Sequence, residues 1–402
     1  MENRLSSSPG NARWRAAAWA GLALAAVSLL LLGAAPAWAI SAEVAAGLSR
    51  GIDRLLNMEL DRAAAEARAV QRMPGGEAIG AFLAAFVPVA RAAETENPSA
   101  EADQFLEALK PIVERVQALE AERPQDAEAR LLAGLVWGSK AMADGLRRNL
   151  LAAHQDLRES HRAFTEALAL RPDLYDAYYG LGLYDLAFAQ MSRLLRSAAS
   201  LVLPPAEPDR GLDKLRLAAE RGSFTRPLAQ LALFRHLVNV EQRYAEAAAQ
   251  GQSLLDRYPN NPDLYFPLAL SYSETGRYDD ALRVARRVGA RIEGGAPPFS
   301  REMQPRYEQL MGKLYMDMGE HATALRFFQK AIEHGNKPYA WVTAWAWTRS
   351  GMIYDLHGDR AEAIRHYRRA LEVEAEGLAV ATAREYLATP YTGNPARPRR
   401  DR

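Results

Sequence analysis

The chain of 402 residues contains no cysteine. This absence excludes a disulfide framework, which exported domains use for stability, and a bacterial lipoprotein anchor, which requires a cysteine behind the leader. The chain also has no marked excess of charge of either sign, because its formal net charge is +1. Proteins that contact nucleic-acid phosphates carry a basic surface, so we predict no nucleic-acid partner.

Signatures of catalysis are scarce. The seven histidines form neither a His-Glu-x-x-His pair nor a run with metal-ligand spacing. Gly47, Ser49 and Gly51 match the Gly-x-Ser-x-Gly pattern of a hydrolase elbow. Such an elbow must follow a strand of a sheet, and only a few residues lie between this match and the predicted cleavage site. The stretch from Gly134 to Lys140 resembles a phosphate-binding loop, but its two glycines are one residue closer together than that motif requires, and they lie in a predicted helix. We predict no catalytic residue, no cofactor and no metal site.

The chain is rich in helix-forming sequence, with 49% hydrophobic residues and several long windows without proline. Near the C-terminus, small and large residues repeat one spacing. In the clearest copy, Trp347, Gly351 and Tyr354 lie at i, i+4 and i+7 and therefore share one helical face. Gly351 lets a partner helix approach closely on that face.

The same copy contains the signals for a turn and a second helix. Gly358 suits the left-handed turn that ends a helix, and Asp359 with Glu362 forms the capping box that starts the next one. The second helix then alternates small and large residues at Ala363, Tyr367 and Ala370.

Three further copies precede this one. One contains Met311, Gly312, Tyr315, Gly319, Ala324, Phe328 and Ala331. A weaker one contains Tyr265, Leu268, Ala269, Tyr272, Gly276 and Ala281, with Ala285 where an aromatic residue is expected. The first begins near Leu228 and contains Leu231, Phe234, Tyr244, Ala247, Leu254 and Pro259. This helix-turn-helix pattern, with a period of about 34 residues, resembles the tetratricopeptide repeat family.

The resemblance implies an all-α fold, a right-handed α-solenoid of stacked helix pairs. It covers residues 228–376 well. Residues 126–227 match only as degenerate repeats with long helices and an insert, where Leu131 and Gly134 open one pair and Phe164 closes it. The apolar insert 191–210 is interpreted as a helical extension followed by a proline-rich loop, which packs across neighbouring repeats or contacts a partner or a membrane.

Residues 40–125 show no clean repeat and are predicted to form a helical capping region. The apolar spacing from Leu48 to Ala67 predicts one amphipathic helix, Pro74 to Gly76 a turn, and Leu106 to Leu119 another helix. At the other end, we predict a C-terminal helix at 377–389 and a disordered basic tail at 390–402.

The N-terminus has the order of a secretory signal peptide. Arg4, Arg13 and Arg15 precede an apolar run from Ala16 to Trp38, which ends in Ala-Trp-Ala. We predict cleavage after Ala39, so that residues 1–39 are lost and the protein is periplasmic or secreted. The alternative is an uncleaved anchor in the inner membrane, formed by residues 16–38.

In this family the concave groove is lined by the first helix of each repeat. The resemblance therefore implies a partner-binding set of His236, Asn239, Phe266, Leu270, Arg306, Gln309, Lys313, Met316, Trp345, Arg349 and Met352. This mixture predicts apolar anchors and one acidic contact with Arg306, Lys313 and Arg349. Leu310 and Trp345 stand at positions of the family's carboxylate clamp, so chaperone tails are not the expected ligand. For Phe266 and Trp345 the alternative is packing against neighbouring helices.

We therefore expect a non-catalytic scaffold of the bacterial cell envelope, which binds a peptide segment or a partner helix in its groove. Two other hypotheses remain open at this point. One is a membrane-anchored assembly factor that uses residues 16–38 and touches lipid through the insert. The other is an enzyme whose site has no recognisable motif.

Overall fold

The computed structural model describes residues 40–92, 98–191, 196–197, 199–335, 340–373 and 377–393. The predicted signal peptide, the anchor that is its alternative, and most of the predicted basic tail lie outside these residues. Within the described ranges, none of the helices combines the length and the apolar character that crossing a bilayer requires.

The described chain is all-helical and contains no strand. Its α-helices are α2 Ala42–Leu56, α3 Leu60–Gln71, α4 Glu77–Ala92, α5 Pro98–Glu122, α6 Ala127–Leu146, α7 Leu150–Leu170, α8 Ala177–Gln190, α10 Gly211–Arg221, α11 Arg226–Asn239, α12 Tyr244–Arg257, α13 Pro262–Glu274, α14 Tyr278–Gly294, α15 Gln304–Asp317, α16 His321–Glu333, α17 Ala340–Leu356, α18 Arg360–Val373 and α19 Leu378–Ala388. Two 3₁₀ turns, η1 Pro208–Arg210 and η2 Arg301–Met303, precede α10 and α15.

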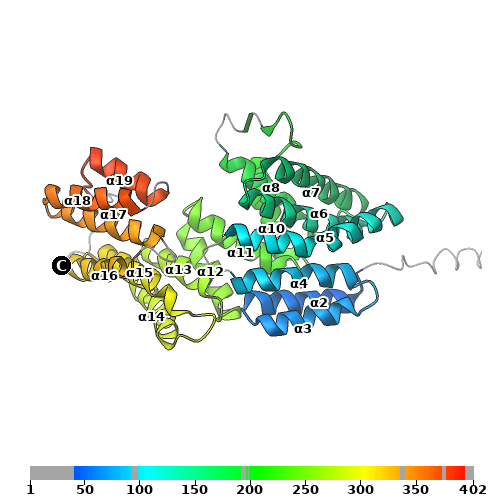
Figure 1. Ribbon diagram of the computed structural model, residues 1–402, viewed down its shortest axis with the longest axis horizontal. Coiled ribbons are helices and arrows are strands. Elements are labelled where there is room, and N and C mark those ends of the chain that lie inside the picture. The colour runs from blue at the N-terminus through cyan, green and yellow to red at the C-terminus, as the bar shows by residue number, and fades with distance from the viewer. Residues whose placement is uncertain are drawn as a thin grey trace, which may run out of the picture.

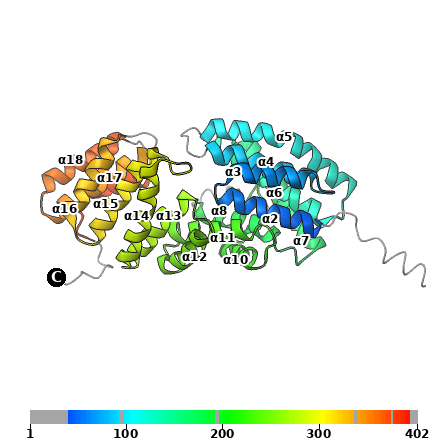
Figure 2. The same cartoon turned by 90° about the horizontal axis from the view of Figure 1, so that it is seen from below.

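The helices pack mainly against their neighbours in sequence, so the chain builds a solenoid, as the sequence predicted. Helices α13 to α19 extend away from the half that contains α2 to α8 (Figure 1). A view from below shows the same elongated arrangement, with α10 to α12 between the two ends (Figure 2).

Glycines facing aromatic rings hold the helix pairs close together. A methyl group on Gly312 of α15 would lie 2.5 Å from the Phe328 ring of α16, and one on Gly351 of α17 would lie 2.6 Å from Tyr367 of α18. Phe328 and Tyr367 are completely buried. The predicted close approach of paired helices is therefore confirmed at both positions.

The turns between paired helices follow the sequence signals closely. Gly276, Gly319 and Gly358 have φ values of 74°, 79° and 81°, which glycine adopts without strain. The capping box predicted for α18 is only half formed. The Asp359 carboxylate accepts a hydrogen bond from the Glu362 amide at 3.1 Å, but the Asp359 amide donates to the Tyr354 carbonyl. This bond closes the preceding turn. Because it already uses the Asp359 amide hydrogen, the Glu362 side chain does not accept a hydrogen bond from that amide.

The N-terminal region differs from the sequence prediction. The single amphipathic helix expected over Leu48 to Ala67 is broken into α2 and α3, because Met58 adopts a left-handed conformation with φ 57°. Helix α4, which contains Pro88, was not predicted, and α5 continues through Pro111 well beyond the expected span. Local periodicity therefore missed α4 and placed the start of α5 too late, because burial against neighbouring helices stabilises helical residues that lack a clear apolar spacing of their own.

The long helices predicted for the first degenerate repeat are α6 and α7, which have 20 and 21 residues. Phe164 of α7 reaches Gly134 of α6, where a methyl group would lie 2.6 Å from its ring. The described part of the insert contains a turn at residues 200–203 and an irregular stretch that leads to η1. In that stretch the Pro204 carbonyl accepts a hydrogen bond from the Tyr184 hydroxyl at 2.6 Å. The residues 192–195 and 198 of the predicted helical extension lie outside the described residues.

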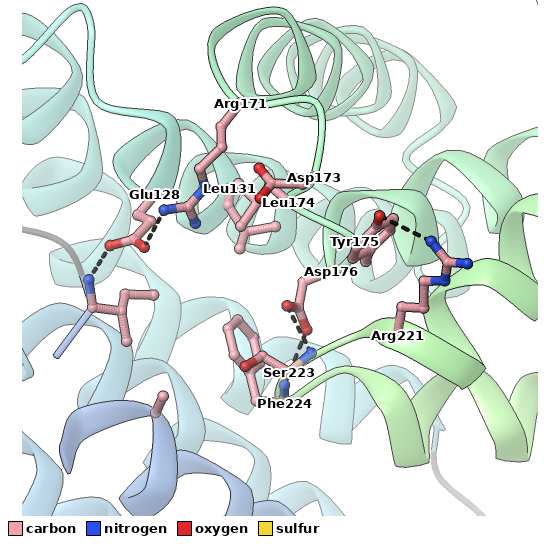
Figure 3. A pocket seen from close by; sticks show the side chains of 12 residues that line it. Glu128, Leu131, Arg171, Asp173, Leu174, Tyr175, Asp176, Arg221, Ser223 and Phe224 are labelled. Carbon is pink, nitrogen blue, oxygen red and sulfur yellow. Dashed lines mark hydrogen bonds and ion pairs between the residues drawn. The ribbon is translucent and has the colours of Figure 1, made fainter. Parts of the chain in front are cut away.

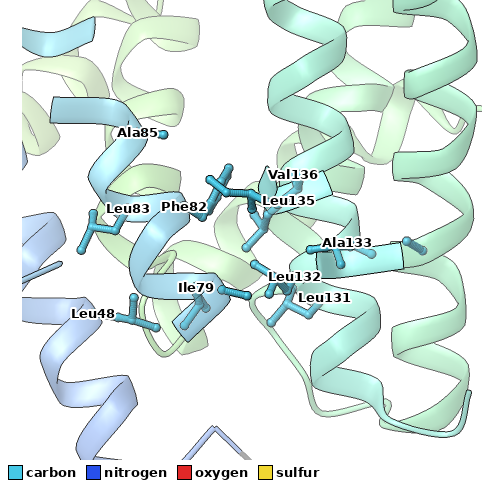
Figure 4. Close-up of a cluster of buried hydrophobic side chains, with 14 of the residues drawn as sticks. Leu48, Ile79, Phe82, Leu83, Ala85, Leu131, Leu132, Ala133, Leu135 and Val136 are labelled. Atoms are coloured by element: carbon cyan, nitrogen blue, oxygen red, sulfur yellow. The ribbon is translucent and has the colours of Figure 1, made fainter. Parts of the chain in front are cut away.

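One hydrophobic cluster joins the N-terminal helices to the degenerate repeats. Figure 4 shows Ile79 and Phe82 of α4 beside Leu132 and Leu135 of α6, and all four side chains are buried. This cluster includes Phe164 and also Leu48 of α2. The helices of residues 40–125 therefore share a core with the repeats that follow.

The N-terminal helices also return to the middle of the solenoid. Arg257, at the end of α12, donates to both carboxylate oxygens of Asp53 at 2.9 Å, and the Tyr258 hydroxyl donates to Asp53 at 2.6 Å. Asn261 donates to the Leu56 carbonyl at 2.9 Å. Burial, together with the hydrogen bond to Asp53, raises the pKa of Tyr258, so this hydroxyl stays protonated and remains a donor.

The close approach of α15 and α16 predicts the effect of adding one carbon atom. Gly312→Ala should lower the free energy of unfolding by about 1–3 kcal/mol, because the new methyl group collides with a buried ring. Urea unfolding followed by circular dichroism measures this loss. Gly294→Ala is the matched control, since nothing lies within 4 Å of its added carbon. Equal effects of the two substitutions would contradict the proposed packing constraint.

Candidate functional site

The first helices of the four C-terminal pairs lie next to one another and form a continuous wall. Helix α13 contacts both α11 and α15, and α15 contacts α17. Their order in space follows their order in sequence, because each pair stacks on the one before it. This wall carries the eleven side chains that the sequence predicted for partner binding.

The structure places these eleven residues at different depths. His236, Phe266 and Gln309 are buried, and Asn239 is exposed. The others are partly exposed, namely Leu270, Arg306, Lys313, Met316, Trp345, Arg349 and Met352. Buried side chains offer a partner little surface, so the contribution of Phe266 is packing, the alternative that the sequence left open for it.

Arg306 bridges three helices of the wall. Its guanidinium lies 3.1 Å from Asp263 of α13 and 3.9 Å from the centre of the Phe266 ring. It also lies 5.9 Å from the centre of the Trp341 ring on α17. Asp263 is in turn 3.6 Å from Arg235 of α11. A cation over an aromatic face and beside a carboxylate is stabilised by both, so Arg306 links the helices it touches.

Lys313, two turns further along α15, also links α15 to α13. Its ammonium donates to Glu274 of α13 at 2.9 Å and also contacts Asp317 of its own helix. Asp317 accepts a second hydrogen bond from Ser273 at 2.6 Å. The Lys313 and Asp317 side chains are only 12% and 2% exposed. The ammonium is therefore engaged within the wall, and this arrangement does not present it to an acidic partner.

Aromatic surface remains accessible at α17. Trp341 is 40% exposed, and Trp345, one turn later, is partly exposed. The Arg349 guanidinium lies 4.4 Å from the centre of the Trp345 ring. Two neighbouring indoles edged by guanidinium groups suit a partner with apolar side chains.

The buried part of α15 includes donors without a partner in the described structure. The Gln309 amide nitrogen and the Arg306 Nε atom are enclosed and make no hydrogen bond there. Arg306, Gln309 and Lys313 share one helical face, because they are three and four residues apart. Unpaired buried donors cost free energy, so this face gains from any acceptor that reaches it.

Sequence reasoning missed several residues of the wall. These are Arg235, Asp263, Glu274, Asp317 and Trp341. One signal was available for Asp317, which follows Lys313 by four residues and so lies on the same face. For Asp263 and Arg306 no local signal exists, because 43 residues separate them.

A second concave feature lies in the N-terminal half. A cavity of about 240 Å³ is bounded by the starts of α2 and α6 and by the α7–α8 and α10–α11 loops. Figure 3 shows Glu128 and Arg171 pointing toward each other at its edge, and their atoms are 2.8 Å apart. Asp176 accepts hydrogen bonds from the amides of Ser223, Phe224 and Thr225, so this buried carboxylate holds the start of α11.

Another hollow, of about 430 Å³, lies between α5, α6 and α7. It contains an ion-pair network in which Glu120 contacts Arg130 at 2.5 Å and Arg162 at 3.2 Å. Arg162 also pairs with Glu166 at 2.8 Å. Arg162 also pairs with Glu159 at 2.9 Å, and the network joins the three helices.

The two motifs that resembled catalytic loops are helical. Ser49 lies inside α2 and its hydroxyl donates to the Ala45 carbonyl at 2.9 Å. Lys140 lies inside α6 and pairs with Asp144 at 3.1 Å and Asp156 at 2.7 Å. Neither position has the strand and turn that the motif requires. In the described part of the chain, no group of three or more His, Asp or Glu side chains has the geometry to hold a metal ion.

The internal ion pair of Lys313 leads to a stability prediction. Lys313→Met should lower the free energy of unfolding by about 2–4 kcal/mol, because two poorly solvated carboxylates lose their cation. Chemical denaturation measures this value. Lys330→Met on the exposed surface of α16 is the matched control and should change stability by less than about 0.5 kcal/mol. A harmless Lys313→Met would show that the ammonium is not needed to hold α13 and α15.

Comparisons with known proteins agree with this geometry. Family models described as tetratricopeptide repeat match residues 241–294 and 307–374. No curated protein matches the chain.

Solved structures resemble the chain at low identity. PilF from Pseudomonas aeruginosa is 15% identical, with 64% of this chain and 98% of that chain covered and a TM-score of 0.38. MamA from Desulfovibrio magneticus RS-1, residues 41 to the end, is 18% identical, with 48% and 96% covered and a TM-score of 0.32. YrrB, a tetratricopeptide repeat protein with an unusual peptide-binding site, is 16% identical, with 67% and 97% covered and a TM-score of 0.27. The functions of these proteins do not transfer at such similarity.

The matched segments coincide with α12 to α14 and with α15 to α18, where left-handed glycines make the turns within helix pairs and, in the later segment, glycine faces an aromatic ring across each pair. On these grounds residues 241–294 and 307–374 of the chain are tetratricopeptide repeats.

Proposed function

We propose that this protein is a non-catalytic scaffold of the bacterial cell envelope, which holds a peptide segment or a helix of a partner protein along α11, α13, α15 and α17. Tetratricopeptide repeats are scaffolds for protein-protein interaction, and that general role follows from the family. The envelope location and the bound segment belong to the proposal. The location rests on the signal-peptide pattern of residues 1–39.

The observation that carries the proposal is the accessible surface of two neighbouring indoles on α17, of which Trp341 is exposed and Trp345 partly exposed. The cations of the wall are engaged with carboxylates and rings, as the contacts of Arg306 and Lys313 demonstrate. Trp341 and Trp345 instead keep accessible surface on α17, the last helix of the wall. Tryptophan is enriched among the residues that dominate binding energy at interfaces. We therefore assign the apolar anchoring of the partner to these two residues.

The test is affinity capture from envelope extracts of the source cells, followed by mass spectrometry. The unchanged protein should capture its partner in stoichiometric amount. The double variant Trp341→Ala and Trp345→Ala should capture at least about tenfold less of that partner. The reason is the loss of two large anchors from the contact surface. Mass spectrometry of the bait also reports whether its chain begins at Ile40.

Leu378→Ala provides the control for this capture. Leu378 is 74% exposed and lies on α19, which is not one of the four helices of the wall, so the substitution removes an exposed apolar side chain without changing a residue of the wall. Circular dichroism should show equal helix content in all three proteins. Undiminished capture by the double variant would overturn the groove assignment, and capture lost equally in the control would point to another surface.

A second candidate function, an assembly factor that touches the membrane, is favoured by one group of exposed side chains. Six apolar residues more than half exposed gather at the α6–α7 tip and in the adjoining insert, namely Met142, Leu146, Leu150, Leu151, Leu201 and Val202. The insert adjoins α7, because the Val202 carbonyl lies 3.2 Å from the His154 Nε2 atom. Arg147 and Arg148 stand between the leucines of the tip. Apolar side chains that protrude beside cations suit insertion into an anionic bilayer.

Flotation with vesicles that contain anionic lipid tests this second function. The unchanged chain starting at Ile40 should float with the vesicles, and Leu150→Ser with Leu151→Ser should lower the bound fraction by about tenfold, because two apolar side chains no longer enter the bilayer. Leu378→Ser, of similar exposure on α19, should bind like the unchanged chain. Absence of flotation by the unchanged chain would remove this function.

A further inference from the structure

The nitrogen of Ile40 meets a buried carboxylate. The Ile40 backbone nitrogen donates to the Oε2 atom of Glu128, a residue 88 positions away on α6. The other carboxylate oxygen of Glu128 lies 2.8 Å from Arg171. The Glu128 side chain is only 10% exposed. This contact lies at the edge of the cavity lined by α2, α6 and the loop after α7.

The position of this nitrogen is set by the packing of α2. Ser41 caps the helix, and its hydroxyl accepts a hydrogen bond from the Val44 amide at 3.1 Å. Val44 and Leu48 are 1% and 2% exposed, and the Ile40 side chain packs against the same hydrophobic cluster. With the helix anchored directly behind it, Ile40 has little freedom to move its nitrogen away from Glu128.

Ile40 is also the residue that the signal-peptide pattern predicts as the first of the mature chain. In an uncut chain its nitrogen is a neutral amide with one N–H group. After cleavage it is an ammonium group with a positive charge and three donors. A buried carboxylate binds a charged donor more strongly than a neutral one, so cleavage strengthens this contact.

We propose that Glu128, with Arg171 beside it, is a binding site for a primary ammonium group, and that its occupant is the α-ammonium of Ile40 created by cleavage after Ala39. The site couples processing to folding, because the new terminus locks α2 onto α6. The inference rests on the proposed export of the protein for the origin of the free terminus.

A comparison of two chain starts in two backgrounds tests the site. One chain begins at Ile40, after removal of a fusion partner by a protease that leaves no extra residue. The other begins at Ala34, so that Ile40 keeps a neutral amide. Each is made with Glu128 and with Glu128→Gln. With Glu128, the chain starting at Ile40 should have an unfolding equilibrium constant about tenfold smaller than the longer chain.

With Glu128→Gln this ratio should fall to near one, because the neutral carboxamide that replaces the carboxylate gains little from a charged donor. A ratio near one with Glu128 present, or an equal ratio in both backgrounds, would overturn the proposal. If the Glu128→Gln chains do not fold, hydrogen exchange of residues 42–48 in the two Glu128 chains decides. Exchange should be slower in the chain starting at Ile40, and equal exchange would overturn the site.

The outcome is separable from that of the proposed function. The chains are prepared without export, so the ammonium site is measured whether or not cells cleave after Ala39. Mass spectrometry of the protein from its own cells, in contrast, reports cleavage alone. An intact leader in cells would refute the predicted cleavage after Ala39 while leaving the measured stabilisation by Glu128 and the free terminus unchanged.

Discussion

Contact between a glycine and an aromatic ring sets the spacing of the helix pairs on which the rest of the structure depends. Gly134 faces Phe164, Gly312 faces Phe328 and Gly351 faces Tyr367, each across its own pair. In a solenoid each pair contacts only its neighbours, so an error in one spacing displaces every pair beyond it. The wall formed by the first helices exists because these distances are kept along the chain.

The charged side chains and the aromatic side chains of that wall have different roles. Arg306 and Lys313 join α13 to α15 through Asp263 and Glu274, so their charges contribute chiefly to cohesion. The indoles of α17 retain accessible area. At the other end, the contacts of Asp53 with the end of α12 brace the N-terminal helices against the repeats. A braced scaffold loses little conformational entropy on binding, which favours affinity.

Sequence patterns predicted the repeats and their turns, because these depend on spacings within one helix pair. The glycines at 276, 319 and 358 were assigned correctly from their place between two apolar patterns. The same reasoning failed between residues 41 and 122, where Met58 breaks an apolar run that looks continuous. It also did not foresee the ion pair of Lys313, since the carboxylate of Glu274, 39 residues away, leaves no mark near the lysine.

The sequence by itself determined the helical class, the positions of the C-terminal repeats and the absence of disulfides, because each follows from composition or from spacings of three to seven residues. Only the tertiary structure decided which charges are engaged, where aromatic surface remains, and that Ile40 meets Glu128. Pairs such as Lys313 with Glu274 and Tyr258 with Asp53 are 39 and 205 residues apart. The first pair meets because neighbouring repeats stack, and the second because α2 folds back onto the end of α12, and no spacing within a single helix encodes either contact.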